Sequence, residues 1–240
     1  MEPDFNHLPP LRTAIMTLHL LQTSIRTILL PLANSNVTTQ RAMTQATTNS
    51  VASLEDKISL ILHKTLDGAI AWATKILATQ KKTDFRPRDE TAMADLLALQ
   101  TPTCLSLATF LTKAYSKASA ALDGPNLAIF TTELAISIRN LLLDHFRKFN
   151  VSAAGGLLVS KDMSKYVELL KGWPLESHVE ESIAILTDVG NLFVIGPEAL
   201  QERLRGGTSG TELSPQEFRT YISKREDAGS VQIQSVLNSI

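Results

Sequence analysis

The spacing of the apolar residues constrains this chain more than any other feature. Between Val51 and Ile76 these positions recur at alternating steps of three and four residues. Such steps place side chains on one face of an α-helix, whereas a strand with one buried face would need steps of two. A seam of this kind is typical of antiparallel helices that pack side by side. We therefore predict an all-α fold of tandem antiparallel helical bundles.

The same spacing predicts four long helices before Asn150, over residues 11–29, 51–79, 102–122 and 127–149. Pro31 ends or kinks the first, and Asp123-Gly124-Pro125-Asn126 separates the last two. The secondary structure of residues 34–49 is ambiguous. They contain poor helix formers but neither Gly nor Pro, so a long helix that continues into the next segment is possible.

After Asn150, Gly and Pro become more frequent and the predicted helices become shorter. We expect Gly155-Gly156 to break the chain, with helices over 157–170, 179–194 and 200–204. Ser214-Pro215-Gln216-Glu217 has the pattern of a capping box, and 231–237 is amphipathic. The predicted domains are a disordered lead at 1–12, a long-helix bundle at 13–150 and a smaller helical bundle at 151–240.

Charge and cysteine content exclude several classes of protein. With 23 basic and 24 acidic residues, the chain has no overall field that would hold nucleic acid or an anionic membrane. Cys104 is the single cysteine, so no intrachain disulfide can form, which favours the cytoplasm. The start lacks a signal-peptide pattern, and no apolar run approaches the roughly 20 residues of a membrane span. We expect a soluble protein without a membrane span.

Sequence signatures of catalysis are missing. We find no phosphate-binding loop, no nucleophile elbow, no zinc-binding helix and no dinucleotide fingerprint. The five histidines lie on separate predicted helices without ligand spacing, so we expect no metal, no cofactor and no catalytic residue. Cys104 is interpreted as a buried small hydrophobe, and His145 as a satisfied, partly buried side chain.

Residues 80–91 combine charge with a proline, which predicts an exposed, mobile connection between helices. Its candidates for partner contact are Lys81, Lys82, Phe85 and Arg86, because cations and an aromatic ring on a loop exceed what a plain connector needs. Nearby acidic residues nearly cancel these charges, so a solvated connection remains the alternative.

A series of short segments resembles successive landmarks of the exocyst subunit family Sec-ten, in the family's order. They are Leu29-Leu30-Pro31-Leu32, Ser53-Leu54-Glu55-Asp56-Lys57-Ile58, Trp72, Gln80-Lys81-Lys82-Thr83-Asp84-Phe85-Arg86-Pro87, Asp123-Gly124-x-Asn126, Gly155-Gly156-Leu157, Lys161-Asp162-x-x-x-Tyr166, and Asn191-Leu192-Phe193-Val194 through Pro197-Glu198-x-Leu200. The ending after Arg225 is similar to fungal members. The resemblance is to the C-terminal third of the family.

This resemblance implies a non-catalytic structural subunit of the exocyst, a rod of helical bundles that tethers secretory vesicles to the plasma membrane before fusion. The implied partners are the other exocyst subunits and, through the assembled complex, small GTPases. The implied location is the cytoplasm, with recruitment to vesicles and to sites of exocytosis, and peripheral membrane association through the complex. The alternative is the Sec-ten-like C-terminal region of a fungal F-box recycling adaptor for a ubiquitin ligase.

Overall fold

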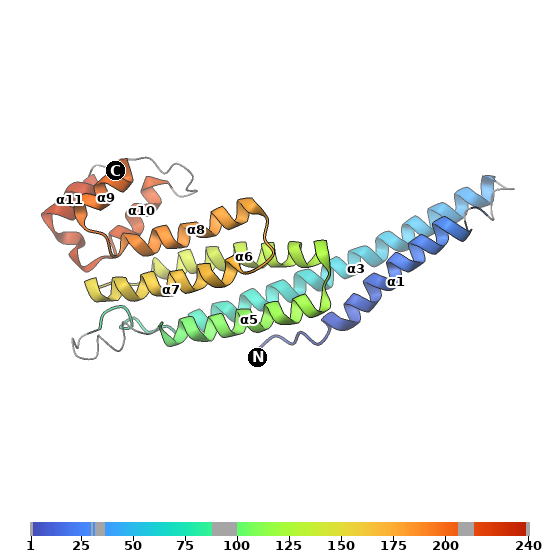
Figure 1. The fold of residues 1–240 in the computed structure, drawn as a ribbon, viewed down its shortest axis with the longest axis horizontal. Coiled ribbons are helices and arrows are strands. Elements are labelled where there is room, and N and C mark those ends of the chain that lie inside the picture. Colours follow the sequence, from blue (N-terminus) through green and yellow to red (C-terminus); the bar gives the residue numbers. More distant parts are fainter. Residues whose placement is uncertain (1, 30, 32–36, 88–99, 206–213, 239–240) are drawn as a thin grey trace.

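A computed structural model describes residues 2–29, 31, 37–87, 100–205 and 214–238 (Figure 1). This part of the chain is helical apart from turns, loops and one isolated bridge between Val151 and Arg225. The elements in chain order are α1 (Leu8–Ser24), the π-helical segment η1 (Ile25–Leu29), α3 (Val37–Leu77), α5 (Pro102–Ala121), α6 (Gly124–Phe146), α7 (Ala153–Lys171), α8 (Ser177–Leu192), α9 (Pro197–Arg205), α10 (Pro215–Ile222), the 3-10 turn η2 (Glu226–Gly229) and α11 (Val231–Asn238). The predicted all-α class is confirmed.

The helices form an elongated body with an arm. In the body, α3, α5, α6, α7 and α8 run side by side, and α9, α10 and α11 cover one end (Figure 1). The arm extends from the opposite end and consists of α1, η1 and the N-terminal half of α3 (Figure 1). The 41-residue helix α3 therefore belongs to both parts. The stretch at 34–49, which the sequence left ambiguous, is helical from Val37 onward.

Local signals set the helix boundaries as predicted. Thr101 caps α5 by accepting the N–H of Cys104, and Pro102 occupies the first turn, where its missing N–H costs nothing. Gly124 turns the chain from α5 into α6 with a φ of +24°, in the region that favours glycine. Ser214 and Glu217 form both hydrogen bonds of the capping box of α10.

One hydrophobic core runs through the described residues, from Phe5 to Leu237. Leu134 and Ile138 of α6 are fully buried in it. The core crosses residue 150, because α6 packs on α8 and α5 packs on α7. The division into bundles at 13–150 and 151–240 stays a prediction, and any such units share a packed boundary.

The expectation of a disordered lead over residues 1–12 is wrong for residues 2–12. Phe5 and Leu8 are buried, and Phe5 packs against Phe110 with ring centroids 6.4 Å apart. His7 Nε2 lies 2.6 Å from Thr65 Oγ1 of α3. Apolar side chains in this segment complete the junction between α1, α3 and α5, and burying an aromatic ring there offsets the cost of ordering the chain.

The expectation that Gly155-Gly156 breaks the chain is also wrong, because both residues lie inside α7 and are buried. A Cβ at Gly155 would overlap the backbone carbonyl of Phe85, and one at Gly156 would overlap that of Phe193. The two glycines therefore allow two other segments to touch the helix backbone. Helical continuity is compatible with glycine where tertiary packing compensates its weak propensity.

Helix α6 is the one helix in the described ranges that is long and apolar enough to cross a membrane by length and composition. A core helix passes the same test, so a single such helix is weak evidence for a span. In this structure α6 packs against α3, α5 and α8, and its buried residues include Phe130, Leu134 and Ile138.

Replacing Gly155 with alanine is expected to destabilise the protein by about 1–3 kcal/mol or more, because the added methyl group meets rigid backbone. Gly68→Ala in α3 is the matched control. Its Cβ would make an ordinary 3.6 Å contact with the Cβ of Pro3, so helix propensity predicts a gain of up to about 1 kcal/mol. Denaturant unfolding measures both, and equal effects would contradict the close approach at Gly155.

Candidate functional site

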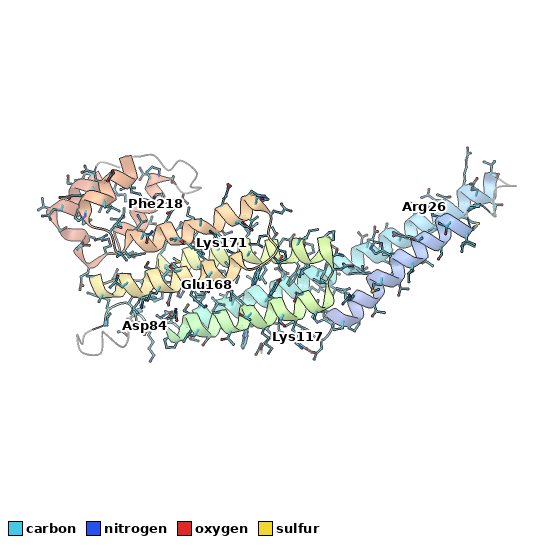
Figure 2. The ribbon with its side chains drawn as sticks, viewed as in Figure 1. Arg26, Asp84, Lys117, Glu168, Lys171 and Phe218 are labelled. Carbon is cyan, nitrogen blue, oxygen red and sulfur yellow. The ribbon has the colours of Figure 1, made fainter. Side chains whose placement is uncertain are left out.

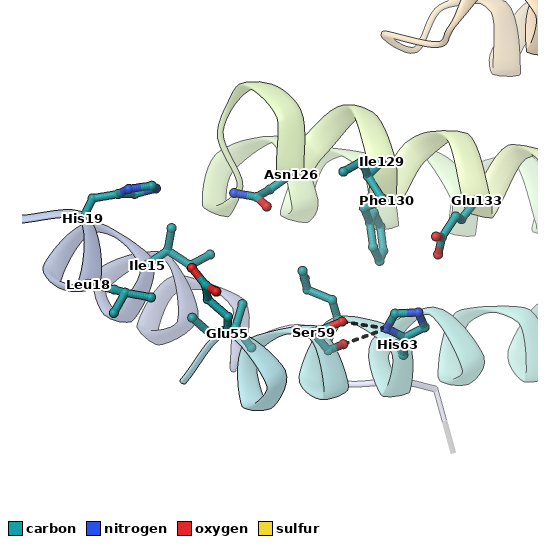
Figure 3. A pocket seen from close by; sticks show the side chains of 12 residues that line it. Ile15, Leu18, His19, Glu55, Ser59, His63, Asn126, Ile129, Phe130 and Glu133 are labelled. Carbon is teal, nitrogen blue, oxygen red and sulfur yellow. Dashed lines mark hydrogen bonds between the residues drawn. The ribbon is translucent and has the colours of Figure 1, made fainter. Parts of the chain in front are cut away.

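The described surface contains a groove at the base of the arm, between α1, α3 and α6 (Figure 3). The hollow has a volume of about 330 Å³, and its walls carry the apolar side chains of Ile15, Leu18, Ile58, Leu62, Ile129 and Phe130. Phe130 and Glu133 project from α6 towards α3, while Ser59 and His63 lie on the opposite wall (Figure 3). This shape is suited to receive an apolar side chain of another molecule.

Polar groups at the rim of this groove form hydrogen bonds within α3 and between α1 and α3. His63 Nδ1 lies 2.8 Å from the carbonyl oxygen of Ser59, one helical turn earlier. Glu55 accepts a hydrogen bond from Gln22 Nε2 at 3.4 Å. In the part of the chain that the structure describes, no three His, Cys, Asp or Glu side chains are grouped to hold a metal. Its apolar walls make the groove a candidate binding surface.

The predicted contact loop is only partly exposed. Lys81, Lys82 and Arg86 lie on the surface, whereas Phe85 is fully buried. The Phe85 ring packs between Phe146 and Phe149 at the end of α6, with centroid distances of 5.5 Å and 5.3 Å. Phe85 as a surface contact is therefore wrong, because an aromatic ring gains more from burial in this cluster than from water.

The backbone of the loop is docked as well. Ser152 donates its N–H to the Phe85 carbonyl at 3.0 Å, and the Asp84 carboxylate accepts from Lys81 N–H and from Gln80 Nε2. The expectation of an exposed connection holds for Lys81, Lys82 and Arg86 but is wrong for Phe85, and mobility of this loop stays a prediction. Residues 88–91 of that connection lie outside the described residues.

Two of the three cations of the loop face an open hollow of about 560 Å³. Lys82 and Arg86 line it together with Lys148, just after the end of α6, and with Glu226. Arg86 and Glu226 form an ion pair of 3.0 Å, with both side chains about half exposed. We call this surface the basic junction. Sequence reasoning missed Lys148 and Glu226, since no local signal brings positions this distant together.

A buried polar cluster joins α5 to α7. The Asp162 carboxylate accepts from Thr101 N–H at 3.0 Å and from the Thr101 hydroxyl at 2.6 Å. Burial raises the pKa of Asp162 to about 6, against the opposing effect of the Thr101 hydrogen bonds. Burial also raises the pKa of the neighbouring Cys104 thiol, so this cysteine is not an activated nucleophile. The interpretation of Cys104 as a buried hydrophobe is confirmed.

His145 is buried among the Phe146 and Phe149 rings, with centroid distances of 5.4 Å and 4.8 Å. Its Nε2 atom has no hydrogen-bond partner among the described residues, so the expectation of a satisfied histidine is wrong for that atom. Burial lowers the pKa of His145 to about 4, which keeps the ring neutral at physiological pH. A neutral ring packs in the aromatic cluster without a buried charge.

Comparisons with known proteins identify the class. A family model described as "Exocyst complex component Sec10-like, alpha-helical bundle" matches residues 1–237. Exocyst complex component SEC10 of Saccharomyces cerevisiae is 30% identical over 210 residues, which cover 88% of this chain and 23% of that protein. SEC10a of Arabidopsis thaliana is 28% identical, covering 90% and 25%. Human Exocyst complex component 5 is 26% identical, covering 90% and 30%.

The chain is therefore a helical-bundle protein of the exocyst component class. It belongs to the Sec10-like family, and the resemblance found in the sequence is confirmed. It spans 23 to 30% of the length of these relatives.

Replacing Phe85 with alanine is expected to cost about 3–5 kcal/mol, because the ring is fully buried at the centre of the aromatic cluster. The exposed Lys82→Ala is expected to change the free energy of unfolding by no more than about 0.5 kcal/mol. Urea denaturation of both variants gives the comparison. If Phe85→Ala were as mild as Lys82→Ala, the loop would not be docked.

The raised pKa of Asp162 predicts that the free energy of unfolding depends on pH. Its folded pKa of about 6 lies above the ordinary 3.8, so between these values the folded state binds more protons than the unfolded state. The stabilisation is complete below pH 4 and is lost as pH rises through 6, by roughly 3 kcal/mol for about two pKa units. Asp162→Asn removes this loss, so its stability relative to the natural protein should increase by about 2 kcal/mol from pH 4 to pH 6, and by the full amount from about pH 3 to pH 7.

The comparison must use the difference between the two proteins, because His145 acts in the opposite direction. Its folded pKa is below its ordinary value, so its effect on stability improves with rising pH over the same window. Both proteins retain His145, and its effect cancels in the difference. Thermal or urea unfolding at half-unit pH intervals measures this difference, and a difference that does not vary with pH would refute a raised pKa at Asp162.

Proposed function

We propose that this chain acts as a non-catalytic structural part of the exocyst, which holds secretory vesicles at the plasma membrane before fusion. The family match over residues 1–237 carries this proposal. The relatives that support it are named as exocyst components in yeast, plants and mammals.

The architecture supports a binding role. An elongated body of parallel and antiparallel helices offers long lateral faces to partner helices (Figure 1). The pKa values of Asp162, Cys104, His145 and Tyr166 are strongly shifted, and burial in the core is the largest cause for each. None of these four lines the groove at the base of the arm or the basic junction.

The partners that we propose are the other exocyst subunits and, through the assembled complex, small GTPases. The proposed location is the cytoplasm with recruitment to vesicles and to sites of exocytosis, where membrane association is peripheral. Lys81, Lys82 and Arg86 are proposed as a partner contact, now with Lys148 in place of the buried Phe85. The F-box adaptor alternative has no support from the comparisons and is not pursued.

The contact is tested by substituting Lys82→Glu and Arg86→Glu together in the longest natural protein that contains this sequence. Reversing two exposed charges should weaken co-precipitation of other exocyst subunits and cause secretory vesicles to accumulate, because complementary charges across an interface would become repulsive. Lys117→Glu, an exposed charge of α5 remote from the junction, is the control (Figure 2).

This experiment tests the contact surface and the proposed exocyst role separately. Normal assembly and secretion in the double variant would remove the basic junction as a contact. Failure of the unmodified protein to co-precipitate any exocyst subunit, with normal secretion after its loss, would overturn the proposed function itself.

A further inference from the structure

The arm contains a surface that the described chain does not cover. Helix α1 has no buried residue after Leu18, η1 has none, and α3 has none before Thr65. Nine of the fourteen exposed large hydrophobic side chains lie between Met16 and Ile61. Two helices alone leave part of each apolar stripe in water, and stable helical bundles usually add a third or fourth helix.

A continuous groove runs along this arm. The hollow at its base, of about 330 Å³, and a second of about 580 Å³ further out share His19 and Glu55 as lining residues. The outer part is lined on α3 by small side chains, among them Thr44, Thr48 and Ala52. From Thr44 to His63 the groove follows α3 for about 29 Å, at 1.5 Å per residue. We call these two hollows together the arm groove.

The charge of the side chains along the arm groove changes from basic at its outer end to acidic at its base. Arg26 lines its outer part and lies near the far end of the arm (Figure 2). Arg41 precedes Thr44 by three residues and Thr48 by seven, so it lies on the same face of α3. Neither arginine has an ion-pair partner among the described residues. Glu55 and Glu133 line the base of the arm groove.

The sequence reinforces this gradient. No Asp or Glu occurs between Asp4 and Glu55, although 24 of the 240 residues are acidic. At that average about five would be expected in such a stretch. The outer end of the arm is therefore basic, whereas Glu55 lies where the two hollows meet and Glu133 lines the base. Such a surface selects a ligand by the order of its charges.

We propose that the arm groove binds one amphipathic helix of a partner protein. The helix places its apolar face in the arm groove, acidic side chains over Arg26 and Arg41, and basic side chains over Glu55 and Glu133. A helix of about 20 residues matches the length of the arm groove. This inference concerns the arm alone and stands whether or not the exocyst assignment holds.

A second copy of the chain is a poorer occupant. Two identical arms in antiparallel order would match in charge, but each would present a concave row of small side chains to the other. A groove that faces a groove leaves unfilled space, whereas a single helix supplies a ridge of large side chains. The geometry therefore favours one inserted helix.

The test uses two designed 20-residue helical peptides of identical composition. Both carry a leucine stripe, and both are used below the concentration at which they self-associate. In the graded peptide all flanking Glu residues occupy one half and all flanking Lys residues the other; in the symmetric peptide Glu is central and Lys is at both ends. Fluorescence anisotropy with the whole 240-residue chain should show at least tenfold tighter binding of the graded peptide.

Charge reversal on the protein tests the order of charges directly. Arg26→Glu with Arg41→Glu makes the whole arm groove acidic, and Glu55→Lys with Glu133→Lys makes it basic, so each pair should reduce binding of the graded peptide at least tenfold. All four substitutions together restore a gradient of opposite direction, and the peptide should bind again in the reversed orientation. All four substituted side chains are exposed, so folding should be retained.

Steric variants test the location. Ala52→Phe places a large side chain in the arm groove and should abolish binding, whereas Ser53→Phe, exposed one position further along α3, should leave binding unchanged. Equal affinity for both peptides, or no binding of either, overturns the proposal. A dimer in sedimentation equilibrium that Ala52→Phe dissociates would assign the arm groove to a second copy and would also overturn it.

Discussion

The arrangement of the body depends on two contacts between backbones at the start of α7. Gly155 and Gly156 are adjacent, and each lets a different segment reach the helix where a Cβ would stand. The first segment is the loop at Phe85, and the second is the end of α8 at Phe193. Because one pair of residues fixes both neighbours, the loop that follows α3 and the segment that follows α8 are held at the same point.

The packing around that point explains why the chain forms one continuous core. Phe85 fills the space between Phe146 and Phe149, and its carbonyl accepts the N–H of Ser152. The C-terminal segment joins the same region through the bridge between Val151 and Arg225. The Arg225 guanidinium donates to the carbonyls of Leu192 and Ile195, each at 2.7 Å. Segments far apart in the sequence are thereby fixed to one end of the body.

The sequence could predict those features that depend on neighbours along the chain. Helix class, the Pro102 start, the turn at Gly124 and the Ser214 capping box all follow from local propensity, and all are present. The buried state of Phe85 and the role of Gly155 could not be predicted in this way, because both depend on contacts between residues far apart in the sequence. The contact site stays a proposal, and its full composition could not be predicted for the same reason. Its lysines are exposed as expected, but Glu226 is 140 positions from Arg86.

Helix α3 connects the arm to the body as a single rod of 41 residues, about 62 Å long. Its outer 28 residues, about 42 Å, lie beyond its first buried residue, Thr65. A helix of this kind acts as a lever with its fulcrum where the body begins. A tilt of about 10° there would displace the tip by about 7 Å by simple geometry. A load on the tip would thus reach the body as torque, so the same helix that presents the arm groove would also transmit mechanical force.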